Sequence, residues 1–548
     1  MQINILIGGK AGDGTITVSE VVSSSLVKAG FFVFNYKDYQ SLIRGGHNFN
    51  IVSFSDQPIN SNENNIDILI AFDNLSYEVH KKNITKDTVV ATADEELSKI
   101  LDCLFVDTRK LGKTGNMAFA SFIFKVLGLK KELLIDEIKT LFSKKEIVTQ
   151  NEQVIDQYYS NEYKQSNKLT IPTLPKKSNN TDYCYIGGSE AIADAAIDAG
   201  LEIYFGYPMT PSTALLISLS LKQKKLNTGN KKGLFVFTPE NEVAIVNSAL
   251  GASYAGKRVM IGTSGGGFDL MTEGISMQGM AEIPLIIHLA QRMGPGTGVP
   301  TYTSQADLNV AIYSGHGEFP RLVVAPGDAE EAYEKTIEAI YLAEKFNLLS
   351  IILTDKHLAE SSYTAQIKKS KLKIPLRKNF PGKGIFRQSS YEHNLSGDTI
   401  EDPKSIKEGV ERRLLKSEKL VQEIHQFTRY KVKGNGKNLI VGYGSTKGAI
   451  QDTLFRENTG LDSNDFTHLH LIYMEPFPMD KEIFELFKKA KNIFVVENTS
   501  TGQLSELICR HLAIKIPGKS RILKYDSLPF TPKYLENEIN SRLKNKTI

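Results

Sequence analysis

The sequence has few cysteines: Cys103, Cys184 and Cys509 are the only three among 548 residues. Because they lie far apart, the chain has no disulfide framework and no Cys-x-x-Cys motif for a metal or an iron–sulfur cluster. No apolar run approaches the ~20 residues that cross a bilayer. The segment Met1–Ile7 also lacks the basic start and apolar centre of a signal peptide. We therefore expect a cytoplasmic protein without membrane contact that binds no metal by itself.

The chain also lacks a strong charge of either sign. Lys and Arg together number 66 and Asp and Glu 62, which leaves a net charge of +4. Spread over this length, that charge gives no electrostatic footprint for nucleic acid or an anionic membrane. A composition with 41% apolar and 23% charged residues is typical of globular proteins. At ~150 residues per domain, the length predicts about three or four domains.

Hydrophobic periodicity predicts an α/β fold with three α/β domains in series. The first block begins with a strand at Ile3–Ile7, a glycine turn and an amphipathic helix that stops at Gly30, the repeat of a parallel α/β sheet. The next segment is rich in Asn, Gln, Ser and Lys and has little periodicity, as in a linker. We expect a first domain at 1–150, a linker at 151–182, a second domain at 183–365, a connecting segment with one helix at 366–437, and a third domain at 438–548.

Two glycine-containing motifs stand out in the first block. Gly9-x-x-Gly12-x-Gly14 joins the first strand to its helix, where helix N–H groups can bind phosphate. Its spacing differs from that of the dinucleotide motif, and a tight turn that lets the helix pack on the sheet is an equal interpretation. Further on, Arg44-Gly45-Gly46-His47-Asn48 gathers a cation and a titratable donor in one predicted loop. The loop could bind an anion, or its hydrogen bonds could be purely structural.

The first motif of the second block is Tyr207-Pro208-Met209-Thr210-Pro211-Ser212-Thr213. This segment places hydroxyl groups at a helix start, where they can cap the helix or face a ligand. Next, Glu240 and Glu242 stand at the start of a predicted helix whose other residues are mostly small and apolar, so we expect this helix, and Glu242 with it, to be buried. A buried carboxylate can share a proton with a ring nitrogen of a ligand, although acids at a helix start also stabilise the helix dipole.

Two further turns in this block follow predicted strands. Gly262–Phe268 contains the glycines Gly265 and Gly266, which allow a backbone to approach a flat ligand closely, or simply form a flexible loop. Arg292 stands at a strand end beside glycines, where a guanidinium can bind a carboxylate through two hydrogen bonds. A surface arginine is the alternative. The carboxyl ends of strands are where ligands bind in open α/β sheets.

Taken in order, these motifs resemble the α subunit of 2-oxoacid:ferredoxin oxidoreductases in the form with a γ domain fused ahead of it. The first block resembles the γ domain, the second the thiamine-pyrimidine-binding domain and the third the transketolase C-terminal-like domain. The segment Tyr391-Glu392-His393, followed by Glu401-Asp402-Pro403, resembles a segment of the 2-oxoglutarate type. The resemblance therefore implies oxidative decarboxylation of 2-oxoglutarate with coenzyme A to succinyl-CoA, carbon dioxide and reduced ferredoxin.

The resemblance also implies roles for individual residues. A glutamate that hydrogen-bonds the pyrimidine of thiamine diphosphate favours its reactive form, and Glu242 fits that role better than Glu240. The implied roles are catalysis for Glu242, oxoacid binding for Tyr207, Thr210, Ser212 and Arg292, cofactor binding for Glu242, Gly265, Gly266 and Phe268, and coenzyme A binding for Arg44 and His47.

What the chain lacks implies a partner. Its scattered cysteines cannot ligate a [4Fe–4S] cluster, and it has no complete motif for the diphosphate and Mg²⁺. The resemblance implies that a β subunit supplies both and that thiamine diphosphate lies between the two chains. We expect an (αβ)₂ assembly that passes electrons to ferredoxin.

Three alternatives stay open. The first is an enzyme of the same family acting on pyruvate or a broad range of 2-oxoacids. The second is a transketolase-like enzyme, which would carry its own diphosphate motif. The third is a non-catalytic nucleotide-binding regulator, which would not need Glu242 and Arg292 in a second domain. Substrate choice also depends on departures from the usual family residues, which are Ile at Met209, Pro at Gly266, and Gly-Gly-Pro-Ser at 293–296.

Overall fold

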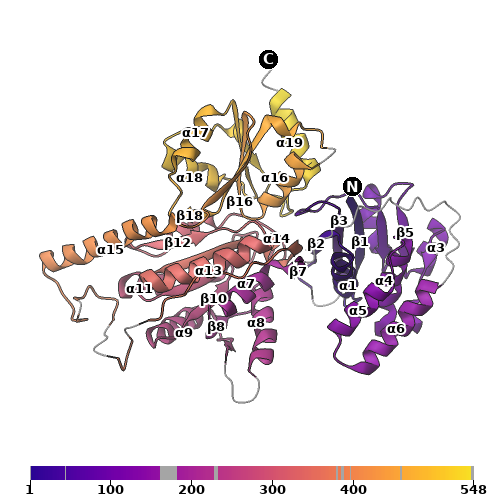
Figure 1. Cartoon of the computed structure of the whole chain (residues 1–548), viewed down its shortest axis with the longest axis horizontal. Helices are drawn as coiled ribbons and strands as arrows, with labels where there is room; N and C mark the ends of the chain where they lie inside the picture. Colours follow the sequence, from indigo (N-terminus) through magenta and orange to yellow (C-terminus); the bar gives the residue numbers. More distant parts are fainter. Residues whose placement is uncertain are drawn as a thin grey trace. The chain divides into compact units, whose positions relative to one another are not determined.

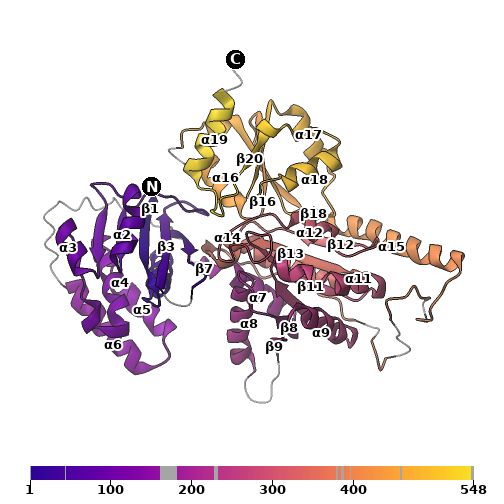
Figure 2. The same cartoon turned by 180° about the vertical axis from the view of Figure 1, so that it is seen from behind.

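The computed structural model describes residues 2–42, 45–160, 182–227, 233–377, 380–383, 388–394, 396–456 and 459–544. Within this part of the chain, the strands form three sheets. The chain divides into two compact units (Figures 1 and 2). The first comprises Met1–Ile186, Ser361–Gln366 and Thr531–Lys533, and the second comprises the remaining residues. None of the described helices combines the length and apolar character that crossing a bilayer requires.

The first unit is built on one mixed sheet. Its strands are β1 (Gln2–Ala11), β2 (Phe32–Asp38), β3 (Gly45–Ser55), β4 (Ile68–Ala71), β5 (Val89–Thr92), β6 (Leu104–Phe105), β7 (Cys184–Gly187) and β14 (Ser362–Ala365). They lie in the order β6-β5-β4-β1-β3-β2-β14-β7. β1 pairs with β4 in parallel, as the repeat predicts, but β3 lies antiparallel between β1 and β2. Since β3 begins at Gly45, the predicted loop at 44–48 is wrong for His47 and Asn48, which lie in a strand.

Helices cover this sheet because their apolar residues recur on one face. They are α1 (Thr15–Lys28), α2 (Asn74–His80), α3 (Glu95–Leu101), α4 (Gly115–Val126), α5 (Glu132–Leu141) and α6 (Lys145–Ser160). Helices α1, α4, α5 and α6 pack together (Figure 1). The predicted face of α1 is confirmed, since Val18, Val21, Val22 and Leu26 are buried. The linker predicted from residue 151 is wrong over 151–160, because α6 continues to Ser160; residues 161–181 lie outside the described part.

The glycine turn before α1 serves the packing of that helix. Gly12 and Gly14 have φ values of 102° and 91°, in the left-handed region that favours glycine. A Cβ atom on Gly14 would also lie 2.0 Å from the Asn116 side-chain amide, which would have to move to make room. These contacts favour the tight-turn interpretation of the motif.

The second unit contains the sheet that carries the predicted site. Its strands are β8 (Ile203–Gly206), β9 (Phe235–Phe237), β10 (Val259–Thr263), β11 (Leu285–Gln291), β12 (Arg321–Val324), β13 (Leu349–Asp355) and β18 (Tyr473–Glu475). They lie in the order β18-β12-β13-β11-β10-β8-β9. All neighbours pair in parallel except β18, which pairs antiparallel with β12.

Helices follow the strands of this sheet in alternation. They are α7 (Gly188–Asp198), α8 (Thr213–Leu226), α9 (Glu242–Tyr254), α10 (Gly265–Asp269), α11 (Thr272–Ala281), α12 (Leu308–Tyr313), α13 (Ala329–Phe346), α14 (Lys356–Glu360) and α15 (Pro403–Ile424). Asp328 caps α13 by accepting a hydrogen bond from the Glu331 amide. The sequence pattern predicts Ser189 as the cap of the helix that ends before Gly200, but Ser189 lies inside α7, whose N-cap is Gly187.

A third sheet belongs to the same unit. Its strands are β15 (Tyr430–Gly434), β16 (Asn438–Tyr443), β17 (Phe466–Leu471), β19 (Asn492–Glu497) and β20 (Arg521–Leu523), in the order β15-β17-β16-β19-β20. The associated helices are α16 (Thr446–Phe455), α17 (Lys481–Lys489), α18 (Gln503–Leu512) and α19 (Pro532–Lys544). The sequence pattern predicts a single strand at 469–473, but this segment is divided: β17 ends at Leu471 in this sheet, and β18 joins the neighbouring sheet from Tyr473.

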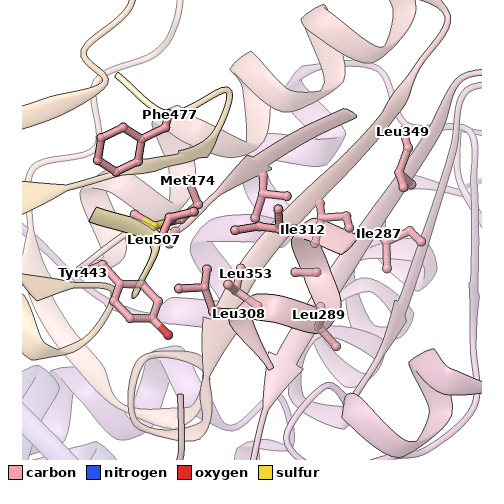
Figure 3. Packing of buried hydrophobic residues seen from close by; sticks show 14 of the residues in the cluster. Ile287, Leu289, Leu308, Ile312, Leu349, Leu353, Tyr443, Met474, Phe477 and Leu507 are labelled. Carbon is pink, nitrogen blue, oxygen red and sulfur yellow. The ribbon is translucent and has the colours of Figure 1, made fainter. Parts of the chain in front are cut away.

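One hydrophobic core serves both sheets of the second unit. Leu308, Ile312 and Leu353 come from the parallel sheet and its helices, whereas Tyr443 and Leu507 come from the C-terminal region. Figure 3 shows these side chains packed side by side. The predicted second and third domains are therefore joined by shared apolar packing.

A buried ionic cluster strengthens the same junction. Glu331 of α13 is 1% exposed, and its carboxylate contacts Lys447 Nζ at 2.6 Å, Lys431 Nζ at 2.8 Å and His470 Nε2 at 2.9 Å. Although burial opposes ionisation, Lys447 and His470 hold the pKa of Glu331 well below its usual range. Lys447 also pairs with Asp328, so α13 is bound to the third sheet by groups that cannot easily be solvated.

We expect Glu331→Gln to destabilise the second unit, because it removes the buried charge that Lys447, Lys431 and His470 share and leaves Lys447 with Asp328 as its one remaining carboxylate contact among the described residues. Removing one partner of a buried ion pair costs about 3 kcal/mol or more. Urea unfolding of the variant measures this loss. The matched control is Glu330→Gln, an exposed neighbour on the same helix, which should change stability by less than about 0.5 kcal/mol. Equal stability of both variants would show that the cluster contributes nothing.

Candidate functional site

The predicted site segments converge at one edge of the parallel sheet. β11, β10, β8 and β9 are consecutive neighbours and all run in the same direction. Their carboxyl ends therefore lie together, and each is followed by one of the predicted motifs. Tyr207 follows β8, Glu242 follows β9, Gly265 follows β10 and Arg292 follows β11. The parallel register thus gathers residues that are far apart in the sequence.

Glu242 is a buried acid at the first position of α9. It is 4% exposed, and helix capping falls to Asn241, whose side chain accepts a hydrogen bond of 2.9 Å from the Ala244 amide. Within the described residues, Glu242 Oε1 has no hydrogen-bond partner. Glu240, in contrast, is exposed. A buried carboxylate oxygen without a donor is costly, so Glu242 is placed to accept a hydrogen bond from a ligand.

The glycines after β10 make room for this carboxylate. A Cβ atom on Gly267 would lie 2.7 Å from Glu242 Oε1 and 2.3 Å from Thr263 Oγ1. Gly265 and Gly266 line a cavity, as expected of residues that approach a ligand. Phe268 is fully buried in the hydrophobic core, so its side chain packs there rather than facing the cavity.

Arg292 connects two of the motifs. Its side chain is 9% exposed, and Nη1 donates a hydrogen bond of 2.7 Å to the backbone carbonyl of Thr210. The carbonyl of Thr210, rather than its hydroxyl, therefore positions the guanidinium. Its Nε has no partner among the residues that the structure describes. Burial lowers the pKa of Arg292, whereas the charges of Asp307 and Glu242 oppose this shift.

Tyr207 and Ser212, the other residues of this motif that are expected to bind the oxoacid, have different environments. Tyr207 is 41% exposed, at the surface beside the strand ends. Ser212 is buried beneath the turn, and a Cβ atom on Gly262 would lie 2.6 Å from its Oγ and 2.1 Å from Tyr204 Oη. Ser212 thus packs against Tyr204 and the β10 backbone, and within the described residues its Oγ has no hydrogen-bond partner.

Next to Arg292 lies a cavity of about 370 Å³ that the sequence did not reveal. Its lining includes Asp307, Ser304 and Tyr525 besides the glycines and Arg292. Burial raises the pKa of Asp307 to about 6, Asp269 adds to the shift, and Arg292 opposes it. The only sequence signal for Asp307 is its place at the end of a polar run, Thr303-Ser304-Gln305, that precedes an apolar helix.

The C-terminal region holds the loop that carries Asp307. Gln305 is fully buried, and its side chain accepts a hydrogen bond of 3.0 Å from the Asn498 amide and donates one of 3.0 Å to the Tyr443 carbonyl. Gln503 donates to the carbonyl of Ala306 at 2.7 Å. The segments around Tyr443 and Asn498 therefore support the loop that carries Asp307.

The coenzyme A candidates belong to the first unit. Arg44 lies outside the described residues. His47 is 8% exposed, its Nε2 lies 2.8 Å from His80 Nε2, and its ring stacks on Phe49. Burial lowers the pKa of both histidines, that of His80 to about 4. His47 thus has a partner inside the fold, which favours the structural interpretation of this residue.

Two family models match the chain. Residues 194–426 match the model described as pyruvate flavodoxin/ferredoxin oxidoreductase, thiamine diphosphate-binding. Residues 4–160 match the model of pyruvate ferredoxin/flavodoxin oxidoreductase. Together the two segments span more than half of the chain, and the first contains the whole strand-end site.

Curated relatives and a solved structure extend this match. The 2-oxoacid:ferredoxin oxidoreductase subunit alpha of a Sulfolobus species is 29% identical over 100% of this chain and 98% of its own length. The 2-oxoglutarate synthase subunit KorA of Archaeoglobus fulgidus is 28% identical over 61% of this chain and 93% of its own length. The fold is shared with the 2-oxoglutarate:ferredoxin oxidoreductase of Magnetococcus marinus, at a TM-score of 0.83, 24% identity and 99% coverage of both chains. The chain belongs to the 2-oxoacid:ferredoxin oxidoreductase family.

Proposed function

We propose that this chain is the α subunit, with a fused γ domain, of an enzyme that oxidatively decarboxylates 2-oxoglutarate with coenzyme A to succinyl-CoA, carbon dioxide and reduced ferredoxin. The observation that carries the proposal is the pair of buried groups with unused hydrogen-bonding atoms, Glu242 Oε1 and Arg292 Nε, which follow β9 and β11 at the same edge of the sheet. An acid and a cation in this arrangement suit a cofactor ring and an oxoacid carboxylate.

The residues present fit thiamine diphosphate. The unused oxygen of Glu242 is the acceptor that a pyrimidine N–H requires, and the absence of a side chain at Gly267 leaves room for that oxygen. When bound, thiamine diphosphate would supply the electron sink that lets carbon dioxide leave a 2-oxoacid. Glu242 would hold a proton at the pyrimidine nitrogen. Arg292, oriented by the Thr210 carbonyl, would bind the oxoacid carboxylate with Tyr207 and Thr210 at the rim.

Names among the relatives support 2-oxoglutarate as substrate. Relatives from Archaeoglobus fulgidus and Methanocaldococcus jannaschii are named 2-oxoglutarate synthase subunits. The segment that resembles the 2-oxoglutarate type is also well ordered by its own contacts. Glu392 accepts two hydrogen bonds from Arg413, of 3.0 and 2.7 Å, and Asp402 caps α15. Gly409 makes room for Glu392, since a Cβ atom there would lie 2.7 Å from the carboxylate.

The same site could instead accept pyruvate or several 2-oxoacids. Gly296 stands where relatives usually carry a serine, so a hydroxyl is missing beside the cavity that Arg292 lines. Co-expression with a β subunit and assay of an oxoacid panel with coenzyme A and a viologen acceptor decides between the substrates. Activity with 2-oxoglutarate alone supports the proposal, and activity with no oxoacid would refute it.

A β subunit would complete the enzyme in the cytoplasm. It would supply Mg²⁺ ligands and the [4Fe–4S] cluster and pass electrons to ferredoxin. An apolar surface beside Glu242 supports such a partner: Val243, Leu270 and Met277 are exposed and line a cavity of about 800 Å³ together with Val410 of α15. Exposed apolar patches of this kind mark protein–protein interfaces.

We expect the isolated chain to bind thiamine diphosphate negligibly, because half of the binding site lies on the β subunit. Mixing with the β subunit should give an (αβ)₂ complex that binds the cofactor. Calorimetry and analytical ultracentrifugation measure both effects. Tight binding to the isolated chain would contradict the shared site.

We expect Glu242→Gln to lower kcat by roughly a hundredfold, as for removal of a positioned proton-transfer group. The variant keeps the side-chain volume and a hydrogen bond, so assembly should survive. Exchange of the cofactor C2 proton with solvent should slow in parallel. The control is Glu240→Gln, at an exposed position two residues away, which should retain normal exchange. Normal exchange in Glu242→Gln would remove the catalytic assignment.

We expect Arg292→Lys to raise the KM for the oxoacid by roughly tenfold or more, because lysine keeps the charge but loses the planar pair of donors. Cofactor binding should stay unchanged. Steady-state kinetics with several oxoacids provide the measurement. An unchanged KM would place the carboxylate contact elsewhere, for example on the β subunit.

A further inference from the structure

Asp307 stands at a helix start but does not cap the helix. An aspartate in the N-cap position of α12 would normally accept a hydrogen bond from an amide of the first turn. Here the Asp307 side chain makes no capping hydrogen bond. It lies against α10 instead, where a Cβ atom on Gly265 would be 2.6 Å from Asp307 Oδ2. The carboxyl group is thus turned away from its own helix and toward the strand-end site.

This orientation is fixed by contacts on both sides of Asp307. Its amide donates a hydrogen bond of 3.0 Å to Oε1 of Gln291, the neighbour of Arg292 in the chain. The two preceding residues are held by the C-terminal region through Gln305 and Ala306. The loop therefore presents the carboxyl group rigidly, beside the residue that we assign to the oxoacid.

The surroundings of the carboxyl group contain a cation and further acids. Arg292 and Asp307 line the same cavity, and Asp269 of α10 lies at its wall. Asp307 interacts electrostatically with Asp269, Arg292 and Tyr443, and Tyr525 lines the cavity. The charge of Glu242, on α9, also interacts with that of Arg292. Glu242 lies next to Gly267, whereas Asp307 lies next to Gly265. Among the described residues, Asp307 Oδ2 has no hydrogen-bond partner.

We propose that Asp307 is a further substrate-site residue, whose carboxyl group faces the oxoacid bound at Arg292 and sets how tightly that anion is held. The proposal rests on the function proposed above. An ionised Asp307 would repel an anionic ligand and compete for the guanidinium. A protonated Asp307 would remove that repulsion and offer a hydrogen-bond donor to the carboxylate.

The direction of the pH effect follows from the environment of the group. Burial, with help from Asp269, raises the pKa of Asp307 to about 6 against the opposing charge of Arg292. Below this pH the carboxyl group is neutral, so the oxoacid binds more tightly. As the pH rises through about 6 the carboxylate forms and binding weakens. Arg292 remains charged throughout this range.

The experiment uses oxamate, which carries the carboxylate and adjacent carbonyl group of a 2-oxoacid but is not decarboxylated. Calorimetry measures the Kd of oxamate for the thiamine-loaded complex with the β subunit across about pH 5.5 to 8. This range covers the titration of a carboxyl group with a raised pKa. The Kd of the wild type for oxamate should rise by roughly threefold or more as the pH increases over this range, as expected when one negative charge forms near the anion. Asp307→Asn should bind with a nearly constant Kd and more tightly than the wild type at high pH.

Two further variants separate this role from a structural one. Asp269→Asn should move the midpoint of the wild-type pH dependence downward, since Asp269 raises the pKa of Asp307. Glu506→Gln removes an exposed acid that does not line the cavity, and it should keep the wild-type dependence. If Asp307→Asn assembles poorly, Asp269→Asn still decides the question.

The outcomes distinguish this inference from the proposed function. The same pH dependence in the wild type and Asp307→Asn, or no oxamate binding to the wild type, would overturn the inference even if oxoacids are turned over. Absence of turnover with every oxoacid would refute the proposed function, while the oxamate titrations still decide the role of Asp307.

Discussion

The site depends on one constraint, the common direction of β11, β10, β8 and β9. Parallel neighbours must end at the same edge of a sheet, so each turn that leaves this edge contributes its residues to one place. Glu242 and Arg292 lie on different turns, and only this register brings them together. The glycines at 265 and 267 are required for the same reason, because the first turn of α10 fits between the carboxyl groups of Glu242 and Asp307 only without side chains.

The C-terminal region acts as a support for this edge. It fills the core beside Leu308 and Leu353, binds α13 through the buried Glu331 cluster, and holds the 305–307 segment through Gln305. Buried polar networks of this kind are costly when incomplete and rigid when every group is paired. A loop that would otherwise move freely is therefore fixed, and the cavity beside Arg292 keeps its shape.

The sequence predicted the α/β class and the segments that form the site, because periodicity and turn chemistry are local signals. It could not predict that β3 lies between β1 and β2, or that the strand at 469–473 divides between two sheets, because such pairings depend on distant residues. Which motif residues face the site also depends on their environment in the fold, which the sequence does not give. Phe268 and Ser212 were placed in the site with Glu242, but both are buried in packing positions. Asp307 was missed because a lone acid before a helix looks like an ordinary cap.

The charged groups of the site share one energetic property. Glu242, Arg292 and Asp307 each bury a polar atom that finds no partner within the described chain, as do the hydroxyl groups of Ser212 and Ser264, whereas the side-chain amide of Gln305 both donates and accepts a hydrogen bond. Leaving such atoms unpaired costs about 1–3 kcal/mol each, and the surrounding network is rigid enough to sustain the cost. One cation is electrostatically coupled to two acids, Glu242 and Asp307, that approach it from opposite sides of the α10 turn. Protonation of Asp307 therefore changes how much of the charge of Arg292 is left for an anionic ligand.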